Sequence, residues 1–371
     1  MSEPPTTSST SPERPAALLR RGWTTGACAT AATRTALEGL VTGSCPSMVE
    51  IALPSGQRVT FSVAKHDAGQ GWVSAGVVKD AGDDPDVTHG ALVVAKVIRG
   101  RDGTGVTFKA GEGVGTVTKP GLPLAVDEPA INPVPRQMMR QAVAEVVALL
   151  DGPGDVEIEI SIPGGVKIAE KTLNARLGIV GGLSILGTTG IVIPYSCAAW
   201  ISSIHRGIDV ARAMGLTHIA GSTGTTSEAA VQRLFGLPDS ALIEMGDFVG
   251  GMLKYLHKHP VPHLTIAGGF AKMVKLGQGL LDLHSKRGAI DTEWLAALLA
   301  RHSSPEDLVE LTRHANSALQ VLQACSERGV PAGIYLAEAA WVTARRALDG
   351  APIKLDVVVF DRDGREVGRW G

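Results

Sequence analysis

The residue types best suited to hold a ligand occur near the start of the chain, in Arg20-Arg21-Gly22-Trp23-Thr24-Thr25-Gly26. Arginine binds carboxylates through paired hydrogen bonds, and Thr24 or Thr25 can cap a helix by accepting hydrogen bonds from free backbone N–H groups. Residues 27–40 favour that helix, and its first turns are nearly all small, so that a flat ligand or another backbone can approach closely. Because a helix N-terminus also attracts anions, the stretch predicts an anion-binding surface; the alternative is a close-packed helix with two surface arginines.

A second stretch, residues 176–190, begins with Arg176 and repeats the pattern as Thr188-Thr189-Gly190. It contains five glycines, and glycine at this density permits close backbone approach or a hinge between domains. The threonine hydroxyls and the backbone N–H groups are hydrogen-bond donors. The stretch therefore predicts a second ligand-binding loop, and a hinge alone is the alternative.

A third threonine pair lies in a loop expected after a short buried strand at residues 216–220. The loop consists of Gly221, Ser222, Thr223, Gly224, Thr225 and Thr226. Asp247 follows the next expected strand, and ligands of parallel sheets bind at the carboxyl ends of the strands. The order is the one expected for a nucleoside cofactor such as S-adenosylmethionine, whose ribose hydroxyls Asp247 would hold. The loop has no lysine after its glycines, so it is not a phosphate loop of the Walker type.

Two further groups are candidates for chemistry, although no residue is assigned a catalytic role. The acidic loop, residues 82–86, contains Asp84, precedes His89 and has the ligand types of a hard-cation site. The preferred interpretation is an acidic turn that caps its own backbone. His284 is a candidate proton shuttle near neutral pH, and a core or surface histidine is the alternative. The spacings of the other histidines and of the cysteines predict no metal site.

The elements that must position these groups divide the chain into two halves. In the first half, expected strands alternate with turns, and a helix with a buried face runs from Pro135 to Leu150. The expected strands are 48–53, 58–64, 71–79, 91–98, 105–108 and 156–162, with turns at 54–57 and 101–103. This pattern predicts an α+β domain with a mainly antiparallel sheet over residues 15–192. The glycine-rich segment 111–121 is expected to be a flexible loop on the substrate side, with Lys119 as a carboxylate partner.

In the second half, helices and short strands alternate in the order expected of a parallel, doubly wound sheet. The expected helices are 202–214, 227–235, 248–257, 294–300, 305–327 and 334–348, and the expected strands are 216–220, 241–245, 263–267 and 354–360. Residues 193–371 are therefore predicted to form a Rossmann-like α/β domain. The late helices are expected as additions that cover the sheet.

Composition limits the classes of function. A chain of 371 residues is long for a single core, which favours two domains. The net charge of −2 and the aromatic content of 4% argue against nucleic-acid partners. The four cysteines include no CxxC pair, which predicts free thiols in the cytoplasm. Residues 1–14 are predicted to be a disordered tail rather than a signal peptide, and no apolar run of about 18 residues predicts a membrane span.

Four long stretches resemble, in order, the cobalt-precorrin-5B C(1)-methyltransferase family of corrin biosynthesis. They are residues 20–32, 80–88, 128–136 and 176–190, and a looser likeness continues through 245–248 and 275–277. The resemblance implies methylation of carbon 1 of cobalt-precorrin-5B by S-adenosylmethionine, giving cobalt-precorrin-6A. It also implies a substrate that is a large, flat macrocycle ringed by carboxylates.

Such a substrate needs a broad apolar cleft with basic residues at its rim. The side chains expected to bind it are Arg20, Arg21, Lys119, Arg136 and Arg176, together with Thr24, Thr25, Gly26, Thr188 and Thr189. Methyl transfer to an electron-rich carbon depends on positioning and on exclusion of water, so no protein nucleophile is expected. Cys28 is accordingly interpreted as a packing residue.

Two other classes of function remain open on the sequence. One is a nucleotide- or phosphate-dependent enzyme that uses loop 221–226; it needs a lysine or metal-binding carboxylates nearby, and the loop itself offers neither. The other is a non-catalytic scaffold that binds a tetrapyrrole and has no nucleoside pocket. No membrane partner is expected, and a homo-oligomer is compatible with the sequence.

Overall fold

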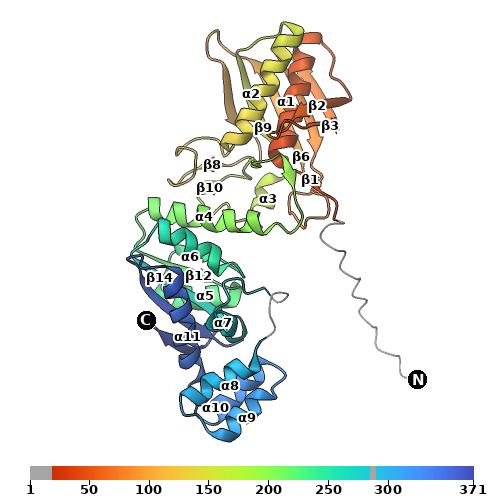
Figure 1. Cartoon of the computed structure of the whole chain (residues 1–371). Helices are drawn as coiled ribbons and strands as arrows, with labels where there is room; N and C mark the ends of the chain where they lie inside the picture. Colours follow the sequence, from red (N-terminus) through yellow and green to blue (C-terminus); the bar gives the residue numbers. More distant parts are fainter. Residues whose placement is uncertain (1–18, 285–289) are drawn as a thin grey trace, which may run out of the picture. The chain divides into compact units, whose positions relative to one another are not determined.

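The computed structural model describes residues 19–284 and 290–371, which fall into two compact units (Figure 1). Unit 1 comprises the described chain up to Thr118 together with Pro123–Ala175 and Ile179–Ser196. Unit 2 comprises Lys119–Leu122, Arg176–Gly178 and Cys197–Gly371. Both units combine helices with strands, so the predicted mixed α/β class is confirmed. The tail predicted at residues 1–14 lies outside the described residues.

Unit 1 is built on a five-stranded sheet in the order β4-β5-β6-β9-β7. Its strands are β4 (Lys65–Gly69), β5 (Trp72–Val78), β6 (Leu92–Arg99), β7 (Val106–Ala110) and β9 (Val156–Ser161). Neighbouring strands are antiparallel except β7, which runs parallel to β9. In β9 the valine and both isoleucines are buried while the residues between them are half-exposed, so one face of the sheet meets the core.

Two long helices pack on this sheet. Helix α1 (Thr25–Thr42) contacts β5 and β6, and α2 (Pro133–Leu150) packs on α1. Residues 25–37 of α1 are buried throughout, because small side chains let the helix lie close to the strands. The remaining elements of unit 1 are β1 (Gly22–Trp23), β2 (Met48–Ala52), β3 (Arg58–Ser62), β8 (Thr116–Val117), α3 (Gly165–Ala169), β10 (Ile179–Val180) and β11 (Ile191–Val192).

Most of the predicted elements of unit 1 are confirmed. Strands β2 and β3 form the predicted hairpin, and α2 matches its predicted range with a start two residues earlier. The turn at 101–103 does not make a hairpin, because β9 lies between β6 and β7. Strand β4 was missed because all five of its residues are exposed and carry no alternation. The flexible loop predicted at 111–121 is instead tied down: Gly111 N donates to Ile160 O at 2.8 Å.

Unit 2 contains a second sheet, in the order β13-β12-β14-β15-β16. Its strands are β12 (His218–Ser222), β13 (Leu242–Glu244), β14 (His263–Gly269), β15 (Lys354–Phe360) and β16 (Glu366–Trp370). All pairs are parallel except β15 with β16. Strand β15 is buried on both faces, since Val357 and Val359 join the core that includes α6, α7 and α11 while Val358 and Phe360 join the core that includes α5. Hence helices cover both sides of the sheet.

The helices of unit 2 are α4 (Cys197–Ala213), α5 (Thr225–Phe235), α6 (Val249–Lys258), α7 (Phe270–Gly277), α8 (Thr292–Arg301), α9 (Glu306–Arg313), α10 (Ala318–Glu327) and α11 (Ala332–Ala347), and a 3-10 helix spans Asp239–Ala241. Figure 1 shows α8, α9 and α10 as a group of their own, which packs on α7 and α11. In the described chain no helix combines the length and the apolar character needed to span a bilayer.

Two predictions for unit 2 need correction. The helix predicted at 305–327 is two helices, because α9 ends at Arg313 and Ser317 caps a new start by accepting a hydrogen bond from Gln320 N. The loop predicted at 221–226 is shorter, since Gly221 and Ser222 belong to β12 and α5 begins at Thr225. Helix α7 and strand β16 were not predicted.

Candidate functional site

The N-terminus of α1 is the place where the two Thr-Thr-Gly stretches of unit 1 meet. Thr24 caps α1, and its backbone N–H donates to Gly190 O at 3.0 Å. Gly26 N donates to Leu186 O at 3.0 Å, and Leu186 N donates to Thr25 Oγ1 at 2.9 Å. The segments 20–26 and 186–195 therefore form one surface, here called the α1 surface, although Thr25 and Leu186 are 161 positions apart in sequence.

The 128–136 stretch supports the same surface. A Cβ atom on Gly26 would lie 2.7 Å from the ring of Pro135, so only glycine allows this contact. Arg136 donates from Nε to Ile131 O at 2.7 Å and pairs with Glu128 at 2.7 Å. Arg136 was predicted as a carboxylate clamp, and its guanidinium is engaged in holding its own loop.

The acidic loop packs beside the segment that precedes α1. Arg20 forms a two-pronged ion pair with Asp80. Hydrogen bonds from Arg20 and from Gly82 N lower the pKa of Asp80 to about 2. Both side chains stay largely exposed, so the pair orders the loop more than it stabilises the fold.

Other carboxylates of this loop also have protein partners. Asp86 pairs with Lys79 at 2.6 Å, and Asp84 Oδ1 accepts a hydrogen bond from Tyr195 N at 2.9 Å. These contacts agree with a turn that uses its aspartates to hold backbone and side chains. Residues 19–284 and 290–371 contain no group of three His, Cys, Asp or Glu side chains that could hold a metal ion.

Asp84 thereby positions an exposed tyrosine that sequence reasoning missed. Tyr195 has a φ of +55°, a backbone conformation that costs energy for a residue with a side chain. Its side chain is 67% exposed, and Leu186 and Ile193 on the same segment are 52% and 54% exposed. Large apolar side chains held at the surface indicate a contact surface for an apolar ligand.

Exposed polar groups lie on the same segments. Arg21 is exposed and forms no hydrogen bond or ion pair with any residue the structure describes. Thr188 and Thr189 are exposed as well, and Thr189 Oγ1 accepts a hydrogen bond from Ile191 N at 3.3 Å. The α1 surface therefore combines a free guanidinium with apolar side chains, which suits a flat ligand that carries carboxylates.

Lys119 and Arg176, two further predicted clamps, belong to unit 2. Arg176 forms a bidentate pair with Glu228, at 2.8 Å and 2.5 Å, and Lys119 Nζ donates to Arg176 O at 3.2 Å. Hydrogen bonding to Glu228 raises the pKa of Arg176. These cations are thus grouped around the first turn of α5.

The predicted cofactor residues lie at the carboxyl ends of β12 and β13. Gly246 N donates to Ser222 O at 3.1 Å, which ties the turn after β13 to the end of β12, and Thr223 N donates to Ala267 O of β14 at 3.0 Å. Asp247 follows directly. Ligands of parallel sheets bind at this edge, and the structure brings the predicted residues together there.

Lys272 is a residue of this edge that sequence reasoning missed. It lies in the first turn of α7, a helix that was not predicted. Its Nζ donates to Thr223 O at 2.8 Å and lies 3.0 Å from Asp247 Oδ1. The loop itself contains no lysine, as the sequence shows, but the fold brings Lys272 beside it.

His284 belongs to a segment that also reaches this edge. Leu283 N donates to Asp247 O at 2.8 Å, and Lys275 Nζ donates to His284 O at 3.3 Å. The His284 side chain is exposed. Its proposed role in proton transfer stays a prediction.

Cys28 is buried in α1 with 0% exposure. Burial raises the pKa of its thiol to about 12, and a thiol that stays protonated is a poor nucleophile. We expect Cys28→Ser to keep kcat within about twofold while losing about 1–3 kcal/mol of stability from the buried hydroxyl. Steady-state kinetics and thermal unfolding of the variant check both numbers; a loss of kcat by two orders of magnitude in a folded variant would contradict the packing role.

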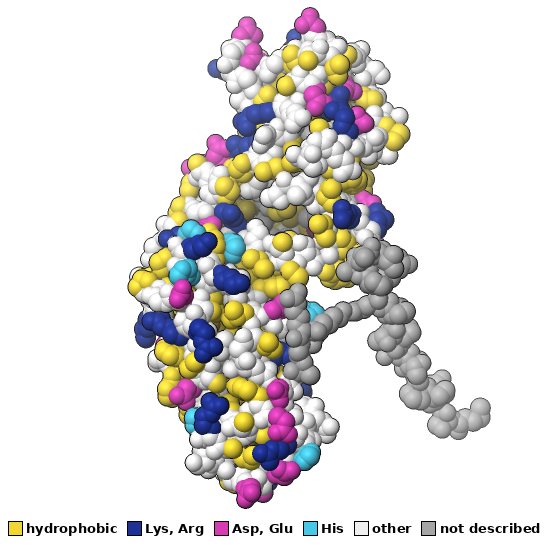
Figure 2. All heavy atoms as spheres, viewed as in Figure 1, with side chains coloured by type: hydrophobic (Ala, Val, Ile, Leu, Met, Phe, Trp, Pro, Cys, Tyr) yellow, Lys and Arg dark blue, Asp and Glu magenta, His cyan; other side chains and the backbone are white. Residues whose placement is uncertain are grey.

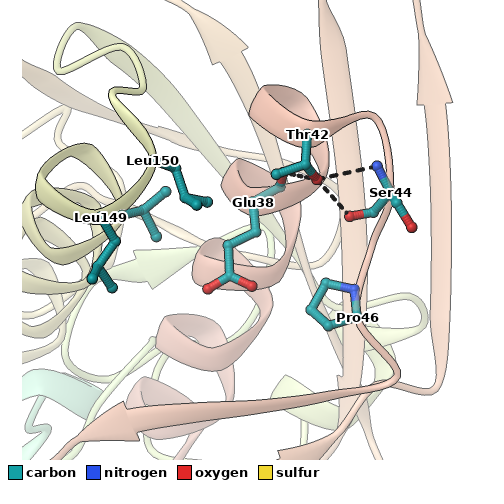
Figure 3. Close-up of a pocket in the computed structure, with 7 residues that line it drawn as sticks. Glu38, Thr42, Ser44, Pro46, Leu149 and Leu150 are labelled. Carbon is teal, nitrogen blue, oxygen red and sulfur yellow. Dashed lines mark hydrogen bonds between the residues drawn. The ribbon is translucent and has the colours of Figure 1, made fainter.

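An open groove of about 380 Å³ lies elsewhere in unit 1, between the C-terminal ends of α1 and α2 (Figure 3). Glu38, Thr42 and Ser44 line one side, and Leu149 and Leu150 project from the other. None of the predicted site residues lines it. The groove is therefore not the candidate site.

On the face shown in Figure 2, basic and acidic side chains are interspersed over both units. No extended field of one sign covers that face. An anionic ligand on that face would therefore be met by local cations rather than by a global basic surface.

Comparison with known proteins finds family models and relatives that match this chain. A family model described as CbiD matches residues 12–194, and one described as CbiD, C-terminal domain, matches residues 282–371. The chain is 66% identical over 351 residues to a protein of Bradyrhizobium sp. strain BTAi1 named cobalt-precorrin-5B C(1)-methyltransferase, covering 95% of this chain and 93% of that protein. A protein of the same name from Methylorubrum extorquens is 60% identical, with coverage of 93% and 96%. A crystal structure of cobalamin biosynthesis protein (cbiD) from Archaeoglobus fulgidus is 28% identical over 72% of this chain and 83% of that one, with a TM-score of 0.40.

Proposed function

The chain belongs to the CbiD family, and from that premise we propose that it methylates carbon 1 of cobalt-precorrin-5B in cobalamin biosynthesis, with S-adenosylmethionine as the donor. The observation that carries the proposal is the sequence identity, over nearly the whole chain, to relatives named for this reaction. The product is cobalt-precorrin-6A. We further propose that the enzyme works in the cytoplasm, as its free cysteines favour.

The macrocycle is assigned to the α+β domain, residues 15–192. Support comes from the α1 surface, where a free guanidinium and exposed apolar side chains occur on segments that pack together. Arg21 would hold a peripheral carboxylate, and Tyr195 would lie against the flat ring. Thr188 would donate a hydrogen bond to the rim, and Thr189, whose hydroxyl donates to Ile191 O at 3.2 Å, would exchange that bond for one to the substrate.

S-adenosylmethionine is assigned to a Rossmann-like domain with helical additions, residues 193–371. The residues at the carboxyl edge of its sheet fit such a ligand, because Ser222 Oγ is buried without a hydrogen-bond partner among the described residues and Asp247 lies beside it in the adjoining turn. When bound, S-adenosylmethionine supplies an electrophilic methyl group. Ser222, Thr223 and the first turn of α5 would hold its polar groups, and Asp247 would accept hydrogen bonds from its ribose.

The protein's contribution to the rate is positioning. Holding two reactants in line and excluding water can account for a large part of a rate enhancement, and the described surroundings of α1 contain no activated nucleophile. Cys28 is buried with a raised pKa. The side chain that takes the proton released from the macrocycle is not assigned.

The test is a methyl-transfer assay with purified protein, isotopically labelled S-adenosylmethionine and enzymatically prepared cobalt-precorrin-5B. We expect the macrocycle to gain one labelled methyl group by mass, at carbon 1 by NMR. Tight binding of the macrocycle without transfer would contradict the proposal and favour a tetrapyrrole scaffold.

Removing the exposed ring at position 195 is expected to weaken substrate binding. Stacking of an aromatic side chain on a flat heterocycle contributes about 1–3 kcal/mol, so Tyr195→Ala should raise KM for the macrocycle about tenfold with little change in kcat. Tyr195→Phe keeps the ring and serves as the control. An unchanged KM in Tyr195→Ala would remove this residue from the substrate site.

A further inference from the structure

A lysine, Lys272, lies at the carboxyl edge of the parallel sheet in unit 2, in the helix that follows β14. Lys272 follows β14, whereas Thr223 and Asp247 follow β12 and β13. The ammonium donates its hydrogen bond to Thr223 O at 2.8 Å. It lies 3.0 Å from Asp247 Oδ1, yet that oxygen is buried and accepts no hydrogen bond from the described residues. Charge attraction alone joins the two groups.

The N-terminus of α5 adds partial positive charge to the same place. Gly224 is its N-cap and supplies no side chain to satisfy the free N–H groups of the first turn. Those N–H groups and the helix dipole favour an anion. Lys272 donates a hydrogen bond to Thr223, the residue just before this N-cap. Its ammonium adds a full positive charge to the partial positive charge of the helix N-terminus.

The buried hydroxyl of Ser222 lacks a hydrogen-bond partner in the described chain, which indicates that a ligand binds beside the N-terminus of α5. Ser222 is 0% exposed, and its Oγ has no hydrogen-bond partner within the described part of the chain. Every second side chain of a strand points to the same face of the sheet, so Ser222 shares a face with Ala220 and His218. That face packs on α5, because His218 contacts Phe235 and Ala220 shares a core with α5. Ser222 therefore faces α5 as well, at the end of β12 where that helix begins.

The charges define the class of ligand. An acceptor group that satisfies Ser222, the α5 N-terminus and Lys272 must be anionic. Because Asp247 lies 3.0 Å from the same ammonium, a doubly charged phosphate would be repelled more strongly than a singly charged carboxylate. Asp247 in turn needs a hydrogen-bond donor. A nucleoside that carries an amino-acid tail offers a carboxylate together with donors.

We infer that Lys272 and the N-terminus of α5 form a carboxylate-binding subsite, which takes the α-carboxylate of the methyl donor while Asp247 accepts from the hydroxyls of its ribose. The inference rests on the proposed function for the identity of the donor. It assigns a role to Lys272, which no sequence motif indicated. It also orients the donor along the edge, with its amino-acid tail over β12 and its nucleoside toward β13.

The experiment compares two nucleosides that differ in the amino-acid tail. S-adenosylhomocysteine has the α-carboxylate, and 5′-methylthioadenosine lacks it. Titration calorimetry on the full-length protein should show Lys272→Met binding S-adenosylhomocysteine about ten- to one-hundredfold more weakly, the loss expected for a charged hydrogen bond. Its affinity for 5′-methylthioadenosine should stay within about twofold, since that ligand never contacts the ammonium.

Two variants control for charge and folding. Lys272→Arg retains the cation and should recover most of the affinity for S-adenosylhomocysteine. Lys254→Met removes an exposed lysine on α6 and should bind both nucleosides as the wild type does. Thermal unfolding of all variants identifies any that fail to fold.

Contrary outcomes separate the subsite from the donor site. Equal binding of S-adenosylhomocysteine by Lys272→Met and wild type would overturn the subsite alone, and so would an equal loss for both nucleosides, which indicates a structural role. Wild-type protein that binds inorganic pyrophosphate more tightly than S-adenosylhomocysteine would make this a phosphate site. Wild-type protein that binds neither nucleoside would overturn the proposed donor site and the subsite with it.

Discussion

Lys79→Met is expected to destabilise unit 1 by about 3–5 kcal/mol, the loss typical when one partner of a buried ion pair is removed. Lys79 is only 2% exposed, and its Nζ lies 2.6 Å from Asp86 Oδ2. Burial alone would raise the pKa of Asp86, but hydrogen bonds from Lys79 and Thr88 together with the charge of Lys79 lower it. Without the ammonium, Asp86 would remain half-buried, with the hydrogen bonds from Thr88 to Oδ1 but no cation at Oδ2.

Hydrogen exchange under increasing urea measures this loss unit by unit. Peptides from β5 and β6 report on unit 1, and peptides from β12 and β14 serve as the internal control within the same chain. Lys65→Met, which removes an exposed lysine of β4, should change stability by no more than about 0.5 kcal/mol. In a double-mutant cycle with Asp86→Asn, we expect a coupling above about 1 kcal/mol; additive losses would show that the pair is not the source of the stability.

Arg21→Gln is expected to raise KM for cobalt-precorrin-5B about ten- to one-hundredfold, because a hydrogen bond to a charged group contributes about 1.5–3 kcal/mol. Arg21 is exposed and has no described protein partner, so its removal should cost little stability. If the guanidinium binds the substrate and the transition state equally, kcat stays near its wild-type value. Steady-state kinetics with the macrocycle as the varied substrate gives both numbers.

Two other arginines, Arg20 and Arg101, provide the comparison for Arg21→Gln. Arg20 is paired with Asp80, so Arg20→Gln should disturb the acidic loop and release the pKa of Asp80 toward its ordinary value. Arg101→Gln removes an exposed arginine from the turn after β6 and should leave KM unchanged. An Arg21→Gln enzyme with wild-type KM would show that the free guanidinium does not hold the substrate.

Periodicity made most of the local structure predictable. Alternating residues indicated β9, and a buried stripe indicated α2, because side-chain direction repeats every two residues in a strand and every 3.6 in a helix. Elements without such a pattern were not predicted. Strand β4 is exposed along its whole length, so neither face carries an apolar signal.

The candidate site was predictable only in part. The motif stretches named Arg20, Arg21 and Asp247. Residue types and spacing could not tell that Arg20 and Arg136 hold loops while Arg21 has no partner among residues 19–284 and 290–371. Whether an arginine can bind a ligand depends on whether an acidic residue already pairs with it. Such acidic residues are distant in sequence, as Asp80 lies 60 positions from Arg20.

By itself, then, the sequence determined the family, the mixed α/β class and the segments that carry the chemistry, because these depend on residue identity and short-range spacing. The tertiary structure decided which segments meet. It placed Tyr195 against Asp84 over 111 positions and Lys272 against Thr223 over 49. Contacts of this kind arise from strand order and helix packing, which bury apolar faces regardless of distance along the chain, and they leave no local signal for a sequence pattern to detect.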